Sequence, residues 1–310
     1  MQINKFTQLL EEHLLDLKYD FKEEERQFIL TINGHEVNFQ KTTSKFQIKP
    51  NEWFQKKHVN NKIHEPGLVA TLCLLSKVID QDTVFFDIGA LFGYHSNIAA
   101  SINQNCKLVL VEGNPITSSV SKEIANNKPY EFINCVVGED NVSRWYFIDV
   151  YNFYPAISYK SIINIIEVTL KNSIKSIFKI FGFRYDYNIY GPFHKIPTIS
   201  IPRLLSKRSK GQIIMKVDAE GHQFKFLMPH IEYLYETGSI ILIELDDPRK
   251  MKSLNGSNVE LIEKLDKSGF EIFWLDHRLP KGVFKVNKFD PWMDRNSLIV
   301  CVPRNILEEL

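Results

Sequence analysis

Two carboxylates and two glycines at the ends of apolar runs form the clearest chemical pattern in this sequence. One apolar run contains Asp87 and ends at Gly89, with Gly93 four residues later, and a second run ends at Glu112, 25 residues after Asp87. In parallel α/β sheets, glycines after the first strand let main chain approach a ligand, and an acid after the second accepts hydrogen bonds from ribose hydroxyls. The spacing therefore predicts one strand, helix, strand unit that holds a ribose-containing cofactor.

The residue between the glycines bears on the choice of cofactor. A dinucleotide fingerprint has a middle glycine where the main chain approaches the pyrophosphate, and Leu91 stands at that place. This argues against a nicotinamide dinucleotide and leaves S-adenosylmethionine as the alternative. A structural interpretation also stays open, in which the glycines only make a tight turn and the acids are buried strand ends.

A second group of titratable residues follows a later apolar run. Asp218, Glu220 and His222 lie at and just after the predicted strand 212–218, and Glu244 ends the next predicted strand. Carboxylates and a histidine that titrates near neutrality are candidates for proton transfer. They are equally candidates for helix capping. Asp246 and Asp247 follow Glu244, so a divalent cation is left open.

Composition excludes several classes of protein. The chain has 310 residues, of which 44% are hydrophobic, and a formal net charge of +1, which disfavours a dedicated nucleic-acid binder. Its four cysteines show no C-x-x-C spacing, which is typical of reduced core residues in a cytoplasmic protein. The first residues lack the apolar core of a secretory signal, and no uncharged apolar run reaches the length of about 18 residues that a membrane span needs.

The pattern of apolar runs predicts a doubly wound, mostly parallel α/β sheet within residues 65–310. Residues 1–64 are predicted to form an appendage, with a helix from Phe6 to Leu17 and a β-hairpin that turns at Asn33-Gly34. Pro66 is predicted to open a helix that continues through Val78. The last two strands are expected to close the sheet as an antiparallel edge hairpin. Predicted strands other than those ending near Asp87 and Glu112 span 130–137, 144–149, 212–218, 239–244, 270–275 and 297–302.

Residues 151–203 are an insertion that a minimal domain of this kind does not need. An amphipathic helix is predicted from Ser161 to Phe181, with lysines opposite its apolar side. From Lys160 to Lys210 there are ten Lys and Arg residues against two acids. The segment is therefore a candidate for contact with an anionic membrane surface, for a lid over a phosphorylated or lipid-linked acceptor, or for packing on the core or a partner subunit.

Taken together, these motifs resemble the FkbM family of S-adenosylmethionine-dependent methyltransferases. The resemblance covers about Pro66 to Arg304 apart from the insertion, and it departs from the family where Ile201-Pro202 replaces the usual Leu-Asp pair. The matching segments are 86–90 with Gly93 and Ser96, then 111–115, 134–138, 216–222 and 243–244.

The resemblance implies a Rossmann-like class I fold and transfer of a methyl group to an oxygen, most often a sugar hydroxyl of a glycan, polysaccharide or glycoconjugate. It places Asp218, Glu220, His222 and Glu244 at the catalytic centre, with His222 or Asp218 as the base. The implied cofactor residues are Asp87, Gly89, Ala90, Gly93, His95, Ser96, Glu112, Asn114, Cys135, Val136 and Gly138. Alternatives are a non-sugar acceptor (a small metabolite, lipid or peptide), a non-catalytic module that docks to glycan machinery and, more distantly, a nicotinamide oxidoreductase.

Overall fold

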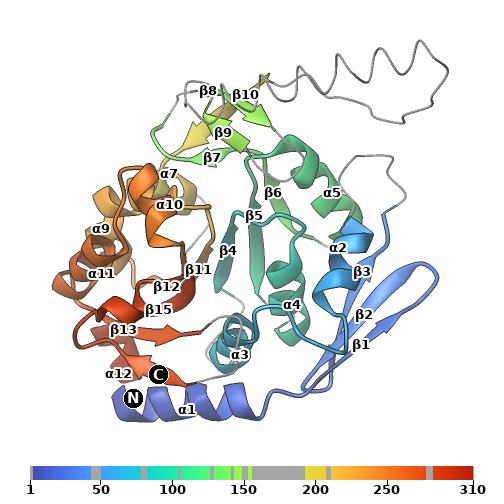
Figure 1. Cartoon of the computed structure of the whole chain (residues 1–310), viewed down its shortest axis with the longest axis horizontal. Coiled ribbons are helices and arrows are strands. Elements are labelled where there is room, and N and C mark those ends of the chain that lie inside the picture. The colour runs from blue at the N-terminus through green and yellow to red at the C-terminus, as the bar shows by residue number, and fades with distance from the viewer. Residues whose placement is uncertain are drawn as a thin grey trace.

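The computed structural model describes residues 3–42, 50–77, 82–103, 106–125, 129–140, 143–148, 153–155, 193–206, 211–276 and 282–309. Eight of the described strands form a central sheet (Figure 1). From one edge to the other they are β14 (Val283–Lys285), β13 (Phe270–Leu275), β15 (Ser297–Pro303), β12 (Ile240–Leu245), β11 (Ile213–Val217), β4 (Val84–Ile88), β5 (Lys107–Val111) and β6 (Glu131–Ile133).

Strand directions confirm the predicted fold class. β12, β11, β4, β5 and β6 run parallel, whereas β15 pairs antiparallel with both β12 and β13. The expected antiparallel pairing of the last two predicted strands is confirmed, but their place at the edge is wrong. β15 is buried along its whole length inside the sheet, and the edge is the short β14, whose Phe284 is exposed. A short strand suits an edge because it offers few unpaired backbone groups.

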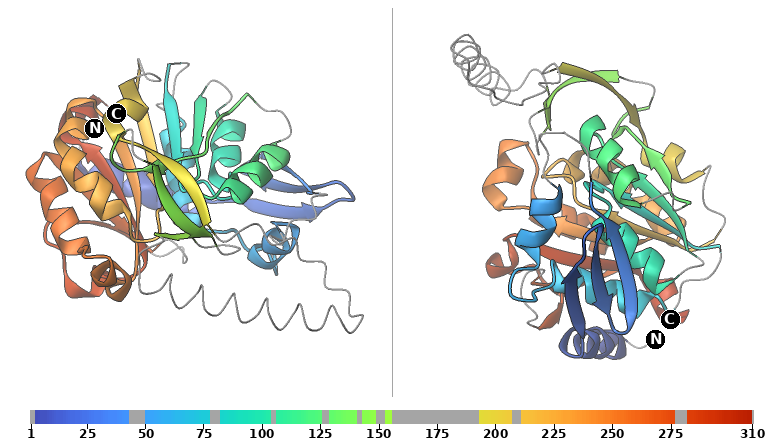
Figure 2. Two further views of the ribbon diagram at one scale, coloured as in Figure 1. Left: turned by 90° about the horizontal axis from the view of Figure 1, so that it is seen from above. Right: turned by 90° about the vertical axis from the view of Figure 1, so that its right-hand side faces the viewer.

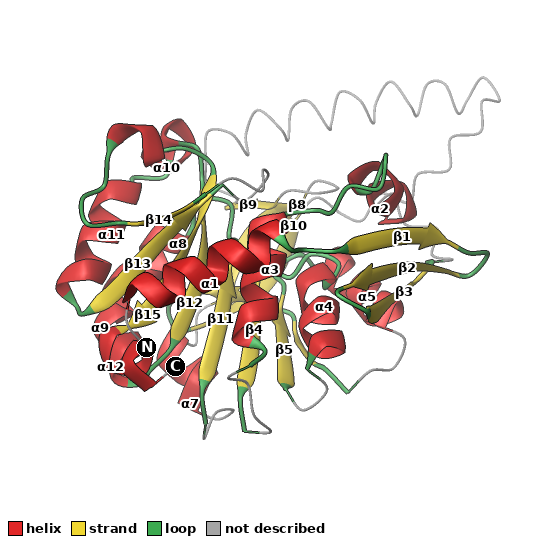
Figure 3. Ribbon diagram, turned by 90° about the horizontal axis from the view of Figure 1, so that it is seen from below, coloured by secondary structure: helices red, strands yellow, loops and turns green. Residues whose placement is uncertain are grey.

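Side chains alternate between the two faces of the sheet, so each face has its own core. Phe85 packs into one core and its neighbour Phe86 into the other. Figure 3 shows α1 and α3 crossing the first face. The helices that contribute to this first core include α1 (Ile3–Leu15), α3 (Pro66–Leu75), α4 (Tyr94–Ile102) and α5 (Pro115–Ala125). On the second face lie α7 (Ile201–Ser206), α8 (Gln223–Leu227), α9 (Ile231–Glu236) and α11 (Asn258–Lys267).

The N-terminal strands form a separate three-stranded sheet that projects from the first face (Figure 2). It comprises β1 (Tyr19–Glu23), β2 (Gln27–Ile32) and β3 (His35–Gln40), and it is followed by α2 (Pro50–Lys57). Asn33 and Gly34 have φ values of 48° and 87°, which confirms the predicted hairpin turn. Phe39 of β3 stacks on Tyr94 of α4 with ring centroids 5.5 Å apart. The predicted appendage thus shares the first core, and the boundary at residue 64 remains a prediction.

A second small sheet lies beyond the end of β6. Its order is β7 (Val136–Val137), β10 (Phe193–Ile199), β8 (Ser143–Ile148) and β9 (Phe153–Pro155). The single strand predicted over 130–137 is therefore wrong, because β6 and β7 belong to different sheets. Between them Asn134 donates through Nδ2 to the carbonyl oxygens of Glu112 and Gly113, which turns the chain. The predicted helix from Ser161 to Phe181 lies outside the described residues.

The remaining helical elements of the described residues are short. They are α10 (Pro248–Ser253), α12 (Arg304–Glu309) and two 3₁₀ turns, η1 (Met228–His230) and η2 (Pro291–Met293). Within the ranges given above, no helix combines the length and the apolar character that crossing a membrane requires.

Candidate functional site

The order of strands reverses direction between β4 and β11. β5 and β6 follow β4 on one side, and β12 follows β11 on the other. In open α/β sheets a ligand binds outside the carboxyl ends of the strands at such a switch point. The loops after β4 and β11 touch there, because Asp218 N donates to Ile88 O at 3.0 Å. A Cβ atom on Gly89 would lie 1.7 Å from Asp218 O, so this contact between loops requires a glycine.

A buried lysine joins the two sides of the switch point. Lys216 Nζ lies 3.2 Å from Asp87 Oδ1, 3.5 Å from Asp218 Oδ2 and 3.1 Å from Gly89 O. Burial opposes protonation, but Asp87, Asp218 and Glu65 outweigh it and raise the pKa of Lys216 above its usual value. Ser96 Oγ donates to Asp87 Oδ2 at 2.7 Å. The sequence analysis did not select Lys216, although its spacing of two from Asp218 puts both on one strand face.

Asp218 and Glu244 form a carboxyl pair on neighbouring strands. Hydrogen bonding to Glu244 is among the influences on the pKa of Asp218, so the two carboxyl groups lie within reach of each other. Burial, with the charges of Asp218 and Glu65, raises the pKa of Glu244 to about 10. Burial also raises the pKa of Asp218, to about 6, against the favourable charge of Lys216. The pair therefore keeps a proton to higher pH than free carboxyl groups do, and Glu244 is the more basic of the two.

Glu65, just before α3, brings a further carboxylate to this face of the sheet. Its φ of 53° is in the left-handed region, and its carboxylate lies 3.0 Å from His64 Nε2 and 3.3 Å from His95 Nε2. Burial lowers the pKa of His95 to about 3, so this imidazole is neutral at pH 7. The sequence analysis missed Glu65, because no local pattern marks a single acid before a helix as part of a distant site.

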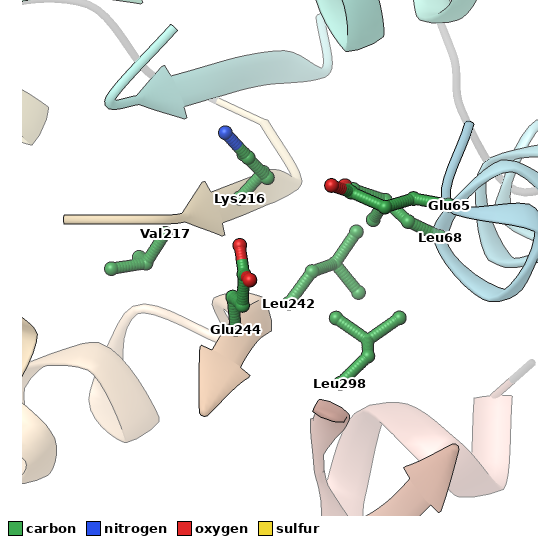
Figure 4. Close-up of a pocket in the computed structure, with 7 residues that line it drawn as sticks. All are labelled: Glu65, Leu68, Lys216, Val217, Leu242, Glu244 and Leu298. Carbon is green, nitrogen blue, oxygen red and sulfur yellow. The ribbon is translucent and has the colours of Figure 1, made fainter. Parts of the chain in front are cut away.

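A small cavity opens between Glu65, Lys216 and Glu244. Its wall is completed by apolar side chains from α3, β11, β12 and β15 (Leu68, Val217, Leu242 and Leu298). Figure 4 shows the Glu65 and Glu244 carboxyl groups reaching toward this space from two different elements. Polar groups that converge in a pocket with apolar walls are typical of a ligand site.

Glu112 holds the glycine loop in shape. Its Oε2 accepts a hydrogen bond from Leu91 N at 2.8 Å, and its Oε1 accepts one from Asn114 N at 2.8 Å. Leu91 has a φ of 48°, so the bulky residue that replaces the middle glycine sits in a left-handed conformation. A carboxylate has about four lone-pair positions, so each oxygen keeps capacity for a ribose hydroxyl. Burial raises the pKa of Glu112.

The other candidate cofactor residues lie along the same loops. Ala90 N donates to Val111 O, and Gly93 N donates to Ala90 O, within the glycine turn. Asn114 is buried and accepts from Ile116 N through Oδ1, which opens α5. Cys135 and Val136 stand where β6 passes into β7, and Gly138 N donates to Ile199 O. These last three lie beyond the edge strand β6, on the side away from Glu244.

Glu220 and His222 lie toward α10. Glu220 is mostly exposed and forms an ion pair with Lys250. Burial, together with the positive charges of Lys225 and Lys250, lowers the pKa of His222.

The acids after Glu244 serve structural contacts. Asp247 caps α10 by accepting from Arg249 N at 2.9 Å. Asp246 pairs with Lys250 and accepts from Gln223 Nε2 at 2.7 Å. Gln223 also donates to Glu244 O at 3.0 Å, which ties the two loops together. Among the described residues, no group of three or more His, Cys, Asp and Glu side chains is arranged to hold a metal ion.

Neither a protein-family model nor a curated protein matches this sequence. Several solved structures, however, are similar to this chain. An FkbM methyltransferase from Methylobacillus flagellatus KT aligns with a TM-score of 0.42 at 9% identity, over 76% of this chain and 53% of its own. The chain thus spans about half the length of that structure. An O-methyltransferase from Bacillus cereus in complex with SAH aligns with a TM-score of 0.36 at 12% identity, over 82% of this chain and 90% of its own.

Aeropyrum pernix fibrillarin with natively bound S-adenosyl-L-methionine aligns with a TM-score of 0.35 at 9% identity, over 92% of this chain and 99% of its own. The fold is a doubly wound, mostly parallel α/β sheet with helices on both faces. The glycine loop follows β4, Glu112 follows β5, Asp218 follows β11, and Glu244 lies near the end of β12.

Proposed function

We propose that this protein is an S-adenosylmethionine-dependent O-methyltransferase that acts on a sugar hydroxyl of a glycan, polysaccharide or glycoconjugate. The observation that carries the proposal is the group formed by the buried Lys216 and the half-buried Asp218 and Glu244 at the switch point of the sheet. The sugar acceptor comes from the resemblance of the motifs to the FkbM family. We also propose a cytoplasmic location, with peripheral membrane or partner-subunit contact through the predicted basic amphipathic helix near residues 161–181.

The residues at the switch point fit S-adenosylmethionine by charge and by hydrogen-bonding capacity. The cofactor carries an ammonium and a sulfonium group, and Asp87, Asp218 and Glu65 outnumber the single buried lysine of the described chain. Glu112 has acceptor capacity for ribose hydroxyls. The glycine loop and Ser96 would hold the methionine portion, and the loop from Cys135 to Gly138 the adenine. When bound, the cofactor supplies an electrophilic methyl group.

The chain's own part in the reaction is to take a proton from the acceptor. An alcohol is a poor nucleophile, so a base must remove its proton as the new bond forms. Asp218 lies 3.5 Å from Lys216 Nζ, whose positive charge favours the ionised form of this carboxyl group. The hydroxyl proton would pass to a carboxylate oxygen of Asp218. Lys216 is buried and apolar side chains line the space beside it, which strengthens these electrostatic interactions.

Calorimetric titration with S-adenosylmethionine and S-adenosylhomocysteine, with NAD as the control, tests the cofactor. We expect micromolar binding of the two sulfur compounds alone. Methyl transfer to a panel of sugars would then be measured for the wild type and for Asp218→Asn, which keeps the shape of the side chain but cannot take the proton. Binding of NAD alone would favour an oxidoreductase, and binding of none of the three would favour a non-catalytic docking module.

A further inference from the structure

Two half-exposed aromatic side chains contact each other beside β14, the edge strand of the central sheet (Figure 3). Phe284 is 45% exposed and Trp292 of η2 is 47% exposed, and their ring centroids lie 5.3 Å apart in an edge-to-face arrangement. The other exposed large apolar side chains of the described residues, Leu15, Val59 and Val259, are aliphatic. Phe284 and Trp292, which we call the aromatic platform, thus form a joint aromatic surface that is open to solvent.

Buried contacts hold the aromatic platform in place. Trp274 of β13 is buried, and its ring centroid lies 5.0 Å from that of Trp292 and 5.9 Å from that of Phe284. Trp274 Nε1 also donates to Met293 O at 3.2 Å, which attaches η2 to the sheet. The positions of both exposed rings are therefore set by buried neighbours, which lowers the entropic cost of binding a ligand.

The aromatic platform lies at the same edge of the sheet as the proposed active site. Glu244 of β12 is paired with Leu298 of β15, which is paired with Leu275 of β13. Leu275 is paired in turn with Val283 of β14, the neighbour of Phe284. Three inter-strand spacings therefore separate the two places, which amounts to about 14 Å. An acceptor made of several linked rings can reach the platform while its reacting hydroxyl lies at the carboxyl pair.

A hydrogen-bonded bridge connects the aromatic platform to the loop after β12. Asn258, the first residue of α11, donates through Nδ2 to Asp294 Oδ1 at 2.8 Å and to Asp246 O at 2.9 Å. Asp294 is two residues after Trp292, and Asp246 is two residues after Glu244. The platform rings lie over the second core, whereas the cavity beside Glu244 is on the first face. A ligand that reaches both crosses the carboxyl ends of the strands, where ligands of such sheets bind.

We infer that the aromatic platform is an acceptor subsite, on which a neutral sugar ring of an extended glycan stacks. The inference rests on the proposed function and adds to it the place where the acceptor is held. The face of an aromatic ring is electronegative, and the C–H groups on one face of a pyranose ring carry partial positive charge, so the two surfaces are complementary. Arg295, whose Cζ lies 5.0 Å from the Trp274 ring centroid, is half-exposed and supplies N–H donors for the sugar hydroxyls.

The size of the aromatic platform favours a sugar ring over a protein surface. A buried aromatic side chain covers about 150–250 Å², so two half-exposed ones offer roughly 200 Å² for contact. A stable protein interface covers about 800 Å² on each partner. Around the platform, Asn287, Lys288 and Arg295 are exposed and polar, so they interrupt the apolar surface. The area thus suits a small number of sugar rings.

Titration calorimetry with neutral hexasaccharides of glucose, galactose and mannose tests the subsite. We expect at least one of them to bind the wild type, and Trp292→Ala to weaken that binding about tenfold. Trp292→Phe keeps an aromatic face and should retain most of the affinity, whereas Phe284→Ala should lose part of it. Leu15→Ala removes an exposed aliphatic side chain from α1 and is the matched control. Affinity for S-adenosylmethionine should be the same in all these proteins.

The outcomes separate this inference from the function on which it rests. If no hexasaccharide binds the wild type, or if Trp292→Ala binds as tightly as the wild type, the subsite is overturned, while binding of S-adenosylmethionine still supports a methyltransferase. If Trp292→Ala loses self-association in sedimentation and keeps its sugar affinity, the platform is a contact between copies of the chain, and the subsite is likewise overturned. If the wild type binds a hexasaccharide but neither S-adenosylmethionine nor S-adenosylhomocysteine, the proposed function fails and the platform remains a sugar-binding surface.

Discussion

Lys216 Nζ lies 3.2 Å from Asp87 Oδ1, with both side chains buried between two neighbouring strands. The two residues are direct register partners in the pairing of β11 with β4. The strand that leads into the glycine loop and the strand that leads into Asp218 are therefore joined by an ion pair as well as by backbone hydrogen bonds. This pair stands at the point where the order of strands reverses.

Removing the lysine should be strongly destabilising. We expect Lys216→Met to lower the free energy of unfolding by about 3–5 kcal/mol near neutral pH, because Asp87 and Asp218 lose their buried counter-charge. Urea unfolding measures this change. Lys225→Met, at an exposed position, is the matched control and should change stability by less than about 0.5 kcal/mol. Equal effects of the two substitutions would show that the buried pair is unimportant for stability.

Gly89 and Gly34 form a natural comparison for the cost of a side chain. Both have positive φ values, of 74° and 87°, but a Cβ at Gly89 would meet Asp218 O at 1.7 Å, whereas at Gly34 nothing lies within 4 Å. Gly34→Ala should cost about 1–2 kcal/mol from backbone strain alone. Gly89→Ala should cost about 3–5 kcal/mol, because steric overlap adds to the strain. Thermal unfolding of both variants checks the difference, and similar losses would contradict the observed contact between loops.

The raised pKa of Glu244, about 10, makes stability depend on pH. The unfolded chain loses this proton near pH 4.5, whereas the folded protein keeps it up to about pH 10. The folded state therefore binds more protons between these values, and its stability falls as pH rises, by up to ~1.4 kcal/mol for each pH unit. Glu244→Gln should flatten this dependence and be more stable than the wild type near pH 9. If the stability of the wild type and that of Glu244→Gln changed with pH in the same way between about pH 6 and about pH 9, a protonated Glu244 would be contradicted.

Glu112 supports the glycine loop and, in the proposed function, the ribose. Glu112→Ala should weaken binding of S-adenosylmethionine by about 1–3 kcal/mol, because backbone donors and ribose hydroxyls lose their acceptor. Calorimetric titration measures the affinity, and the exposed Glu236→Ala serves as the control. If affinity is unchanged while the protein is less stable, Glu112 acts only on the loop and not on the cofactor.

Local patterns in the sequence predicted the central strands and the hairpin turn, because these features depend on residues that are neighbours along the chain. The apolar runs that end at Asp87, Glu112 and Asp218 are strands because their side chains are buried on both faces. Asn33-Gly34 makes the predicted turn because both residues tolerate positive φ. The order of these strands and the loops that follow them also placed the candidate acids at one edge of the sheet.

Other features depend on contacts between residues distant in the sequence, and only the tertiary structure decided them. Glu65 reaches the cavity beside Lys216 and Glu244 because α3 packs on that face, and nothing local in the sequence marks this encounter. β15 enters the sheet between β12 and β13 because a mostly apolar strand gains more from burial on both sides than from an edge. Periodicity determines which residues can be buried. Long-range packing determines which of them meet, and therefore which charges share one buried site.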